Sequence, residues 1–256
     1  LSITGDTLYF QNNIVPYQTL YSVRNSSSWS NPQRILYNLN SAHYFQVTNK
    51  GNHFISSISN PSLGASDWCN LTMSGTDTSV ISLGVPVSTS GDNLDFYIAR
   101  DESFIITTSP AGLNVSFNKN NRWTNPKNLG SQINFGLGMW GPFVTSDKKY
   151  LFYTTGTNPN YSDTRVHWVR IDSLIDSLMQ TNFIPYINCK IPNQTDSVGY
   201  NYNYTFPDTT FIDDDGNNTL TYSATLNNGN PLPSWLSFNP STRAFSGTPT
   251  STGNYF

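Results

Sequence analysis

The sequence predicts an all-β protein made of short antiparallel strands, and three observations support this prediction. Aromatic residues make up 14% of the 256 residues, and Tyr and Phe, with 15 each, are residues that strands favour. Charged residues make up only 11%, whereas about 25% is usual in a soluble domain. Short apolar stretches alternate with loops rich in Gly, Pro, Asn and Ser along most of the chain, which is the pattern of strands and turns.

The charge balance excludes several classes of protein. With 13 Lys and Arg against 16 Asp and Glu, the chain has a formal net charge of −3 and lacks the dense basic surface that nucleic acid requires. The low content of Glu and Lys argues against a coiled coil or a highly charged disordered tail. No stretch approaches the roughly 18 apolar residues of a membrane helix, so no membrane-spanning segment is predicted. We expect a water-exposed protein outside the cytoplasm.

The strand pattern repeats in the first part of the chain. Residues 96–98 and 103–108 recur as residues 143–145 and 150–155, which sets a period of about 47 residues. Earlier copies lie at residues 45–57 and, truncated, at residues 6–10. A tryptophan followed by Asn-Pro gives a second landmark, because it occurs at Trp29 and again, two periods later, at Trp123. Four short strands at this period are typical of a β-propeller blade, and an array of β-sandwiches is the alternative.

The copies that can be seen do not complete a large propeller. Four copies are visible, and propellers of this type more often have about six blades. The first copy begins inside a strand, and no export signal is visible at Leu1. We therefore expect further blades upstream, with a closed four-bladed propeller as the alternative.

Only residues 171–179 have a convincing helical pattern. The apolar residues there follow the i, i+3, i+4, i+7 spacing of one helical face: Ile171, Leu174, Ile175 and Leu178. Asp172 or Ser173 is available to cap the start of the helix.

These repeats carry a resemblance to a known family. The stretches TSDKKYLFYTTG (residues 145–156) and RVHWVRID (165–172), with the outer-strand stretch at 121–134, resemble the WD40-like, TolB-type (PD40) propeller repeats of bacterial envelope proteins. The resemblance covers about residues 1–180. It implies a first domain of propeller repeats over residues 1–186, ending in the short helix.

A different pattern begins after the helix, at residues 187–256. Its blocks occur in order at residues 191–195, 204–207, 211–216, 220–224, 232–238 and 242–249. They resemble the dystroglycan-type cadherin-like (Ig-like) domain of bacterial surface proteins, which implies a β-sandwich. Alternating apolar residues predict half-buried strands at 220–224 and 236–238, and Trp235 is expected to anchor the core.

Members of that family continue into a final strand that this chain lacks after Phe256. A sandwich without its last strand has an open edge, and an open edge is a template for pairing. Either the protein continues beyond this sequence, which we favour, or another chain completes the sheet by strand addition.

The strongest ionic cluster is Asp213-Asp214-Asp215-Gly216-Asn217. Adjacent carboxylates repel one another, and Ca²⁺ takes six to eight oxygen ligands from loops of this kind. The resemblance to cadherin-like domains implies calcium as the cofactor, with Asp213 and Asp215 as metal ligands. The alternative is a solvated turn in which Gly216 adopts positive φ. No other cofactor is predicted.

The two cysteines leave a choice open. Cys69 and Cys189 lie far apart in the sequence and fit no zinc pattern. They form either one long-range disulfide or two free thiols.

No catalytic residue is predicted. The sequence has no Gly-x-Ser-x-Gly elbow, no His-Glu-x-x-His and no Walker loop. Of the three histidines, His43, His53 and His167, the last two fall within or beside strands, so packed or pore-facing side chains are expected for them rather than catalytic bases. A glycosidase carboxylate pair stays open because its members are distant in sequence. Trp140, Tyr161 and Tyr21 could stack on sugars, although core packing explains such residues equally well.

The first hypothesis is therefore a non-catalytic binding or structural segment of a large exported bacterial cell-surface protein. The propeller would bind protein or glycan, and the cadherin-like module would serve spacing, adhesion or assembly. One alternative is an enzyme that processes polysaccharide or peptide, with the propeller as its active-site or accessory domain. Another is a subunit of a self-assembling surface fibre. An extracellular or cell-surface location is expected, with the outer envelope or periplasm included.

Overall fold

The computed structural model describes residues 2, 4–12, 18–36, 39, 42–57, 65–74, 77–91, 93, 95–158, 160 and 162–256, apart from the side chains of residues 42, 43 and 77. The chain divides into two compact units, Leu1–Thr181 (unit 1) and Asn182–Phe256 (unit 2). The division lies close to the predicted boundary between residues 186 and 187. In the described part of the chain, no helix is long and apolar enough to cross a membrane.

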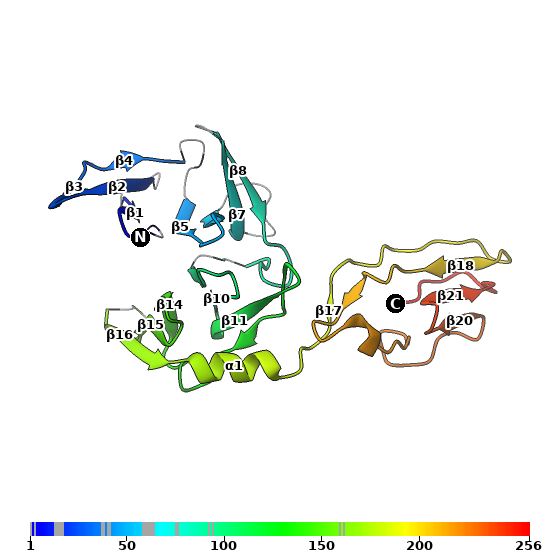
Figure 1. The fold of residues 1–256 in the computed structure, drawn as a ribbon. Helices are drawn as coiled ribbons and strands as arrows, with labels where there is room; N and C mark the ends of the chain where they lie inside the picture. The colour runs from blue at the N-terminus through cyan, green and yellow to red at the C-terminus, as the bar shows by residue number, and fades with distance from the viewer. Residues whose placement is uncertain are drawn as a thin grey trace. The chain divides into compact units, whose positions relative to one another are not determined.

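The described residues of unit 1 form four consecutive antiparallel sheets (Figure 1). Sheet 1 is formed by β1 (Thr7–Gln11), β2 (Thr19–Asn25), β3 (Ser28–Trp29) and β4 (Gln33–Arg34). Sheet 2 is formed by β5 (Ala42–Val47), β6 (His53–Ser57), β7 (Asp67–Ser74) and β8 (Asp77–Ser82). Sheet 3 is formed by β9 (Phe96–Ile98), β10 (Phe104–Ser109), β11 (Gly112–Lys119), β12 (Arg122–Trp123) and β13 (Lys127–Asn128). Sheet 4 is formed by β14 (Gly138–Val144), β15 (Tyr150–Gly156) and β16 (Thr164–Arg170).

The register of these sheets confirms the predicted repeat. The first two strands pair through equivalent residues in three sheets: Val47 opposite His53, Ile98 opposite Ile105, and Val144 opposite Leu151. In sheet 1, β2 pairs with both β3 and β4, as β11 pairs with both β12 and β13. Strand β1 therefore corresponds to β6, β10 and β15. We call β5, β9 and β14 the inner strands.

Successive sheets pack against one another through their inner strands. Strand β5 contacts β1 and β2, β9 contacts β5, and β14 contacts β9, β10 and β11. The largest described core cluster combines Phe54 and Trp68 of sheet 2 with Phe96, Ile98 and Ile105 of sheet 3. These side chains are almost completely buried. Sheets 2 and 3 thus bury apolar residues against each other, which is the packing expected of propeller blades.

Two polar side chains join sheets 2 and 3. Gln46 donates from Nε2 to the Phe96 carbonyl oxygen (2.7 Å) and accepts at Oε1 from the Ile98 amide (3.0 Å). Its side-chain amide thus hydrogen-bonds to the backbone of β9 as a neighbouring strand would. The buried Glu102 accepts at Oε1 from the Thr48 hydroxyl (2.5 Å) and from Asn52 Nδ2 (2.8 Å). Lys50 lies 3.4 Å from the other carboxylate oxygen.

We expect Glu102→Ala to lower the free energy of unfolding of unit 1 by about 2–4 kcal/mol, because it removes a buried carboxylate that accepts from both Thr48 and Asn52. Asp101→Ala is the matched control. Asp101 bonds the Lys148 ammonium of sheet 4 at 2.7 Å, but both side chains are about half exposed, so its loss should cost less than about 1 kcal/mol. Urea unfolding measures both variants. Equal losses of unfolding free energy in the two variants would contradict a stabilising role for the buried Glu102 hydrogen bonds.

The predicted helix is present as α1 (Asp172–Gln180). Ile171 and Ile175 are buried and Leu174 and Leu178 half-buried, which confirms the predicted apolar face. The predicted side-chain cap is absent, because Ile171, whose side chain has no polar atom, occupies the N-cap position. Asp172 is already the first helical residue, where its carboxylate binds Arg170 (2.9 Å) and accepts from the Ser173 amide (3.0 Å). At the other end, Lys127 Nζ of β13 donates to the carbonyl oxygens of Leu178 (2.8 Å) and Thr181 (2.5 Å). A cation there stabilises the C-terminal end of the helix dipole.

Unit 2 is built from two small antiparallel sheets. One pairs β17 (Tyr186–Ile187) with β19 (Phe211–Ile212). The other has the order β18 (Tyr202–Thr205), β21 (Ala244–Gly247), β20 (Leu236–Asn239). Its core centres on the buried Phe206, whose ring lies 5.6–6.1 Å from the rings of Phe211, Tyr222 and Phe238.

Two predictions for unit 2 are wrong in detail. Residues 220–224 alternate between half-buried and exposed as predicted, but they belong to no described strand. Trp235 is half-buried and packs edge-to-face on Tyr255 (5.5 Å), so Phe206 rather than Trp235 anchors the core. The reason is position: Phe206 directly follows β18 and faces three rings, whereas Trp235 lies beside the C-terminal residues.

Cys69 and Cys189 are both free thiols. Cys69 is buried in β7, where loss of solvation and then the Asp67 carboxylate raise the pKa of its thiol to about 12. Cys189 is exposed in unit 2, and its sulfur lies 3.6 Å from Asn188 Nδ2. Of the two alternatives that the sequence left open, the structure has the free thiols.

Candidate functional site

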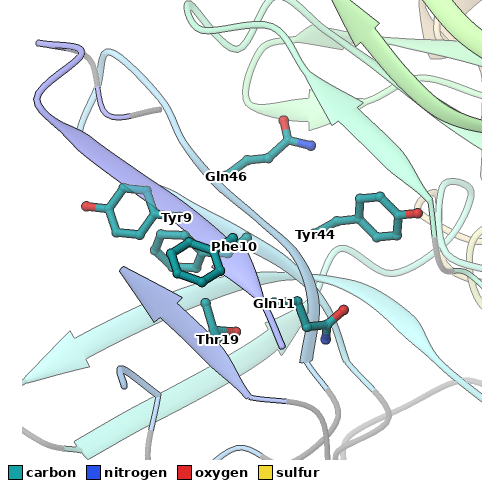
Figure 2. A pocket seen from close by; sticks show the side chains of 7 residues that line it. Tyr9, Phe10, Gln11, Thr19, Tyr44 and Gln46 are labelled. Atoms are coloured by element: carbon teal, nitrogen blue, oxygen red, sulfur yellow. The ribbon is translucent and has the colours of Figure 1, made fainter. Parts of the chain in front are cut away.

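A pocket of about 390 Å³ opens between sheet 1 and sheet 2 (Figure 2). Sheet 1 supplies Tyr9, Phe10 and Gln11 from β1 and Thr19 from β2. The inner strand of sheet 2 supplies Tyr44, Phe45 and Gln46. In Figure 2, Tyr9 and Tyr44 lie on opposite sides of the view, with Gln46 above and Gln11 and Thr19 below.

The aromatic wall of this pocket is formed by the packing of the two sheets. The Tyr9 ring lies 4.7 Å from the Phe45 ring, and Phe45 in turn lies 5.6 Å from His53 of β6. Burial raises the pKa of the Tyr9 phenol. Gln46 cannot swing freely, because its carboxamide is held by β9 as described above. This side of the pocket is therefore preorganised.

A β-bulge orients Tyr44. The register of β5 shifts between His43 and Gln46, and Tyr44 has φ +54° there. Strand β14 shifts at the equivalent place, where Gly141 has φ +56°. Bulges redirect side chains locally and often lie beside functional sites. Here the bulge directs Tyr44 toward the buried Asp95, at the start of sheet 3.

Asp95 links the two bulged strands. Its Oδ2 accepts from the Gly141 amide (2.7 Å), and its carboxylate also bonds the Tyr44 hydroxyl. Loss of solvation, and then the charge of Asp95, raise the pKa of Tyr44 well above that of a free phenol. Tyr44 is therefore a neutral hydrogen-bonded phenol throughout the physiological pH range.

The chemistry of the lining favours binding of an uncharged ligand. None of the seven lining residues carries a charge, and none is a nucleophile paired with a base. Aromatic rings offer faces for stacking, while Gln11 and Thr19 offer amide and hydroxyl groups for hydrogen bonds; the Gln46 carboxamide is engaged by β9. Pockets of this kind combine apolar walls with a few polar groups that fix orientation.

The predicted metal ligands are engaged in local hydrogen bonds. Asp213 accepts at Oδ1 from the Asp215 amide (2.9 Å) and at Oδ2 from the Thr219 hydroxyl (2.7 Å), at the end of the 3₁₀ turn η1 (Asn217–Thr219). Asp215 Oδ2 accepts from the Phe183 amide (2.6 Å). Gly216 has φ +125°, as expected for such a turn. Across the described residues, no three His, Cys, Asp or Glu side chains gather closely enough to hold a metal ion.

The other sequence candidates are dispersed. His53 lies in β6, where burial lowers its pKa, and His167 lies in β16 with Nε2 2.9 Å from Thr155 Oγ1. The Tyr21 hydroxyl donates to Gln33 Oε1 (2.5 Å). Trp140 is half-buried in β14. Tyr161 and the side chain of His43 lie outside what the structure describes.

The pocket itself was not predicted from the sequence. Its residues come from two copies of the repeat and match no motif. The copies of the repeat contain aromatic residues, such as Tyr9 in β1 and Phe45 in the inner strand β5, but their strands are not equivalent and their spacing does not indicate a cavity.

Comparisons with known proteins support the Ig-like assignment of unit 2. Residues 185–255 match the family model of a putative Ig domain. No curated protein matches the chain.

Solved structures resemble the chain at low identity. TolB from Acinetobacter baumannii has 14% identity and a TM-score of 0.42, over 67% of this chain and 40% of that one. Kuenenia stuttgartiensis hydrazine synthase has 10% identity and a TM-score of 0.40, over 66% of this chain and 57% of that one. A putative 6-phosphogluconolactonase from Bacteroides uniformis has 7% identity and a TM-score of 0.39, over 65% of this chain and 69% of that one. The chain thus spans about half the length of the first two. By its own sheets and register, it is a nearly all-β chain of four propeller-like blades followed by an Ig-like domain.

Proposed function

We propose that this chain is a non-catalytic binding segment of an exported bacterial cell-surface protein, in which unit 1 binds the ligand and unit 2 serves as a spacer or adhesion module. The observation that carries the proposal is the uncharged, aromatic- and amide-lined pocket between sheets 1 and 2. The sequence resemblance to PD40 repeats and to cadherin-like domains of bacterial surface proteins supports the location.

The ligand class that fits best is a neutral glycan. Pyranose rings present an apolar face that stacks on aromatic side chains, and their hydroxyls exchange hydrogen bonds with amides. A charged ligand would leave its charge without a partner among the lining residues. A protein ligand would have to insert an uncharged side chain of similar shape.

Binding of neutral oligosaccharides to the 256-residue protein tests the proposal. Calorimetry should show binding that Tyr9→Ala weakens about tenfold, because the stacking ring is lost. Tyr9→Phe keeps the ring against Phe45 and should bind almost as tightly. Tyr200→Ala, at an exposed tyrosine of unit 2, is the control. Equal weakening by Tyr9→Ala and Tyr200→Ala, or a total lack of binding, would count against a glycan pocket.

Calcium at Asp213 and Asp215 is part of the same proposal, resting on the resemblance to cadherin-like domains. A hundredfold excess of Ca²⁺ over Kd should stabilise unit 2 by about 2.7 kcal/mol, and Asp213→Asn should remove this effect. Calorimetric melting with Ca²⁺ and with a chelator measures it. Identical melting temperatures in the two solutions would rule the site out and leave the hydrogen-bonded turn.

A further inference from the structure

Sheet 4 presents an aromatic face to solvent that the equivalent sheets bury. Phe143, Phe152 and Trp168 are direct cross-strand neighbours on β14, β15 and β16, and Val166 lies two residues from Trp168 on the same face. These side chains are 55% (Phe143), 36% (Phe152), 66% (Trp168) and 73% (Val166) exposed. The opposite face of sheet 4, with Val144, Leu151 and Tyr153, is buried.

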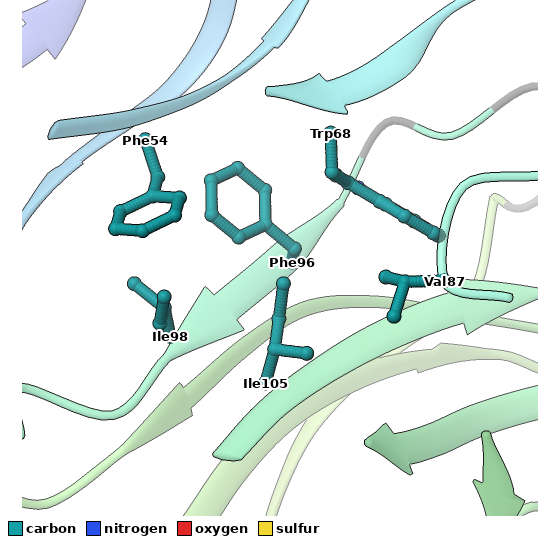
Figure 3. Packing of buried hydrophobic residues seen from close by; sticks show 6 residues of the cluster. All are labelled: Phe54, Trp68, Val87, Phe96, Ile98 and Ile105. Carbon is teal, nitrogen blue, oxygen red and sulfur yellow. The ribbon is translucent and has the colours of Figure 1, made fainter. Parts of the chain in front are cut away.

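The repeat shows what normally covers this face. In sheet 3 the equivalent cross-strand neighbours are Tyr97, Ile106 and Val115, all buried, and the inner strand β14 of the next sheet lies against them. In sheet 2, Phe54 is the residue equivalent to Phe152, and it packs on Phe96 of the next inner strand, β9. Figure 3 shows the Phe96 ring between Phe54 and Trp68. The face is therefore built for sheet-on-sheet packing.

Among the described residues, the Tyr97 ring of sheet 3 packs edge-on against Phe143 at 5.9 Å, but it leaves most of this face of sheet 4 exposed. The helix α1 follows β16, but Lys127 of β13 holds its C-terminal end, and Phe152 and Trp168 stay exposed. The aromatic rings are already ordered against one another, because Phe143 lies 6.4 Å from Phe152 and Trp168 lies 5.7 Å from Tyr150. An ordered surface loses little side-chain entropy when it is covered.

We propose that this face binds a second copy of this chain, so that two sheets 4 pack face to face about a two-fold axis. A two-fold interface uses the same surface patch on both subunits, so this patch must be complementary to itself. An apolar sheet face meets this requirement, because it can pack on a copy of itself. The Arg170 guanidinium, on the same face, is neutralised by Asp172, so two copies do not bring unpaired charges together. This inference is independent of the ligand pocket.

The size of the patch suits a dimer. From their exposed fractions, the four side chains offer about 500 Å² of surface. That is at the upper end of what a monomer usually exposes as one patch. Two such faces together bury about 1,000 Å², the lower bound for a specific interface, before neighbouring residues such as Tyr150 and Thr154 are included.

Sedimentation of the 256-residue protein over a wide concentration range tests the proposal. We expect a monomer–dimer equilibrium whose dissociation constant Trp168→Lys raises at least about thirtyfold, as loss of a central tryptophan does at interfaces. Ile81→Lys is the matched control, because Ile81 is equally exposed on the outer strand β8 of sheet 2. It should leave the constant within about twofold.

Hydrogen exchange gives a second readout that does not depend on a variant. Amides of β15 and β16 should exchange more slowly as dimer accumulates, whereas those of β8 should not change. A monomer at every concentration overturns the proposal. So does an association that Trp168→Lys leaves intact, or one that Ile81→Lys weakens as much.

Discussion

Phe96→Ala is expected to lower the free energy of unfolding of unit 1 by about 3–5 kcal/mol, the usual cost of removing a fully buried phenylalanine. Phe96 is 1% exposed and packs between sheets 2 and 3, against Phe54, Trp68 and Ile105 (Figure 3). The cavity left behind cannot close easily, because the inner strand that carries it is also fixed by Gln46. Denaturant unfolding at equilibrium measures the change.

The control for this prediction is an exposed phenylalanine of an inner strand. Phe143→Ala, measured at a concentration where the protein is monomeric, should cost less than about 1 kcal/mol, because more than half of that side chain is exposed. If Phe96→Ala cost no more than Phe143→Ala, the packing of successive blades described here would be wrong.

Gly247→Ala is expected to destabilise unit 2 by about 3 kcal/mol or more. A Cβ at Gly247 would lie 1.8 Å from the carbonyl oxygen of Trp235, a backbone atom that cannot move without shifting β20. Gly247 is opposite both Tyr202 and Leu236, so the shift would disturb all three strands of the sheet. Overpacking of a well-packed core costs 1–3 kcal/mol, and a backbone clash costs more.

Calorimetry separates this effect from unit 1. Gly247→Ala should lower or abolish the melting transition of unit 2 and leave that of unit 1 unchanged. Gly253→Ala is the control, because a Cβ there meets only the Tyr255 ring at an ordinary 3.6 Å. A variant that melts like the wild type would contradict the close approach of β20 and β21.

Much of the fold could be predicted because it repeats. The tryptophan landmarks at Trp29 and Trp123 fall on equivalent short outer strands, and the period of the strands matches the register of Ile98 with Ile105 and of Val144 with Leu151. The helix followed from its apolar spacing. The predicted side-chain cap was wrong, because the helix begins one residue earlier than a cap at Asp172 requires and leaves Ile171 at the N-cap position.

The Ig-like unit was predicted by its motifs but not in its details. The last of its motifs, at residues 242–249, contains Gly247, and the structure explains this glycine by its close approach to the Trp235 carbonyl oxygen. The core aromatic was wrongly predicted, since nothing in local sequence distinguishes Phe206 from Trp235. Which of them is buried depends on partners distant in sequence, such as Phe211 and Tyr222.

The pocket depended on tertiary structure in the same way. Tyr44 points toward Asp95 because of a bulge, and Tyr9 meets Phe45 because two sheets pack. Neither arrangement leaves a spacing or motif in the sequence. Composition shows a chain that is poor in charged residues and rich in aromatic ones, but it does not show where a pocket forms.

Amide chemical shifts of the 256-residue protein, followed while a neutral oligosaccharide is added, test the central claim most directly. We predict that the largest changes occur in β1 and β5, at Tyr9, Gln11, Tyr44 and Gln46, and that charged oligosaccharides of the same length cause none. Changes confined to other strands or to unit 2, or changes caused by charged sugars alone, would contradict the proposed binding site.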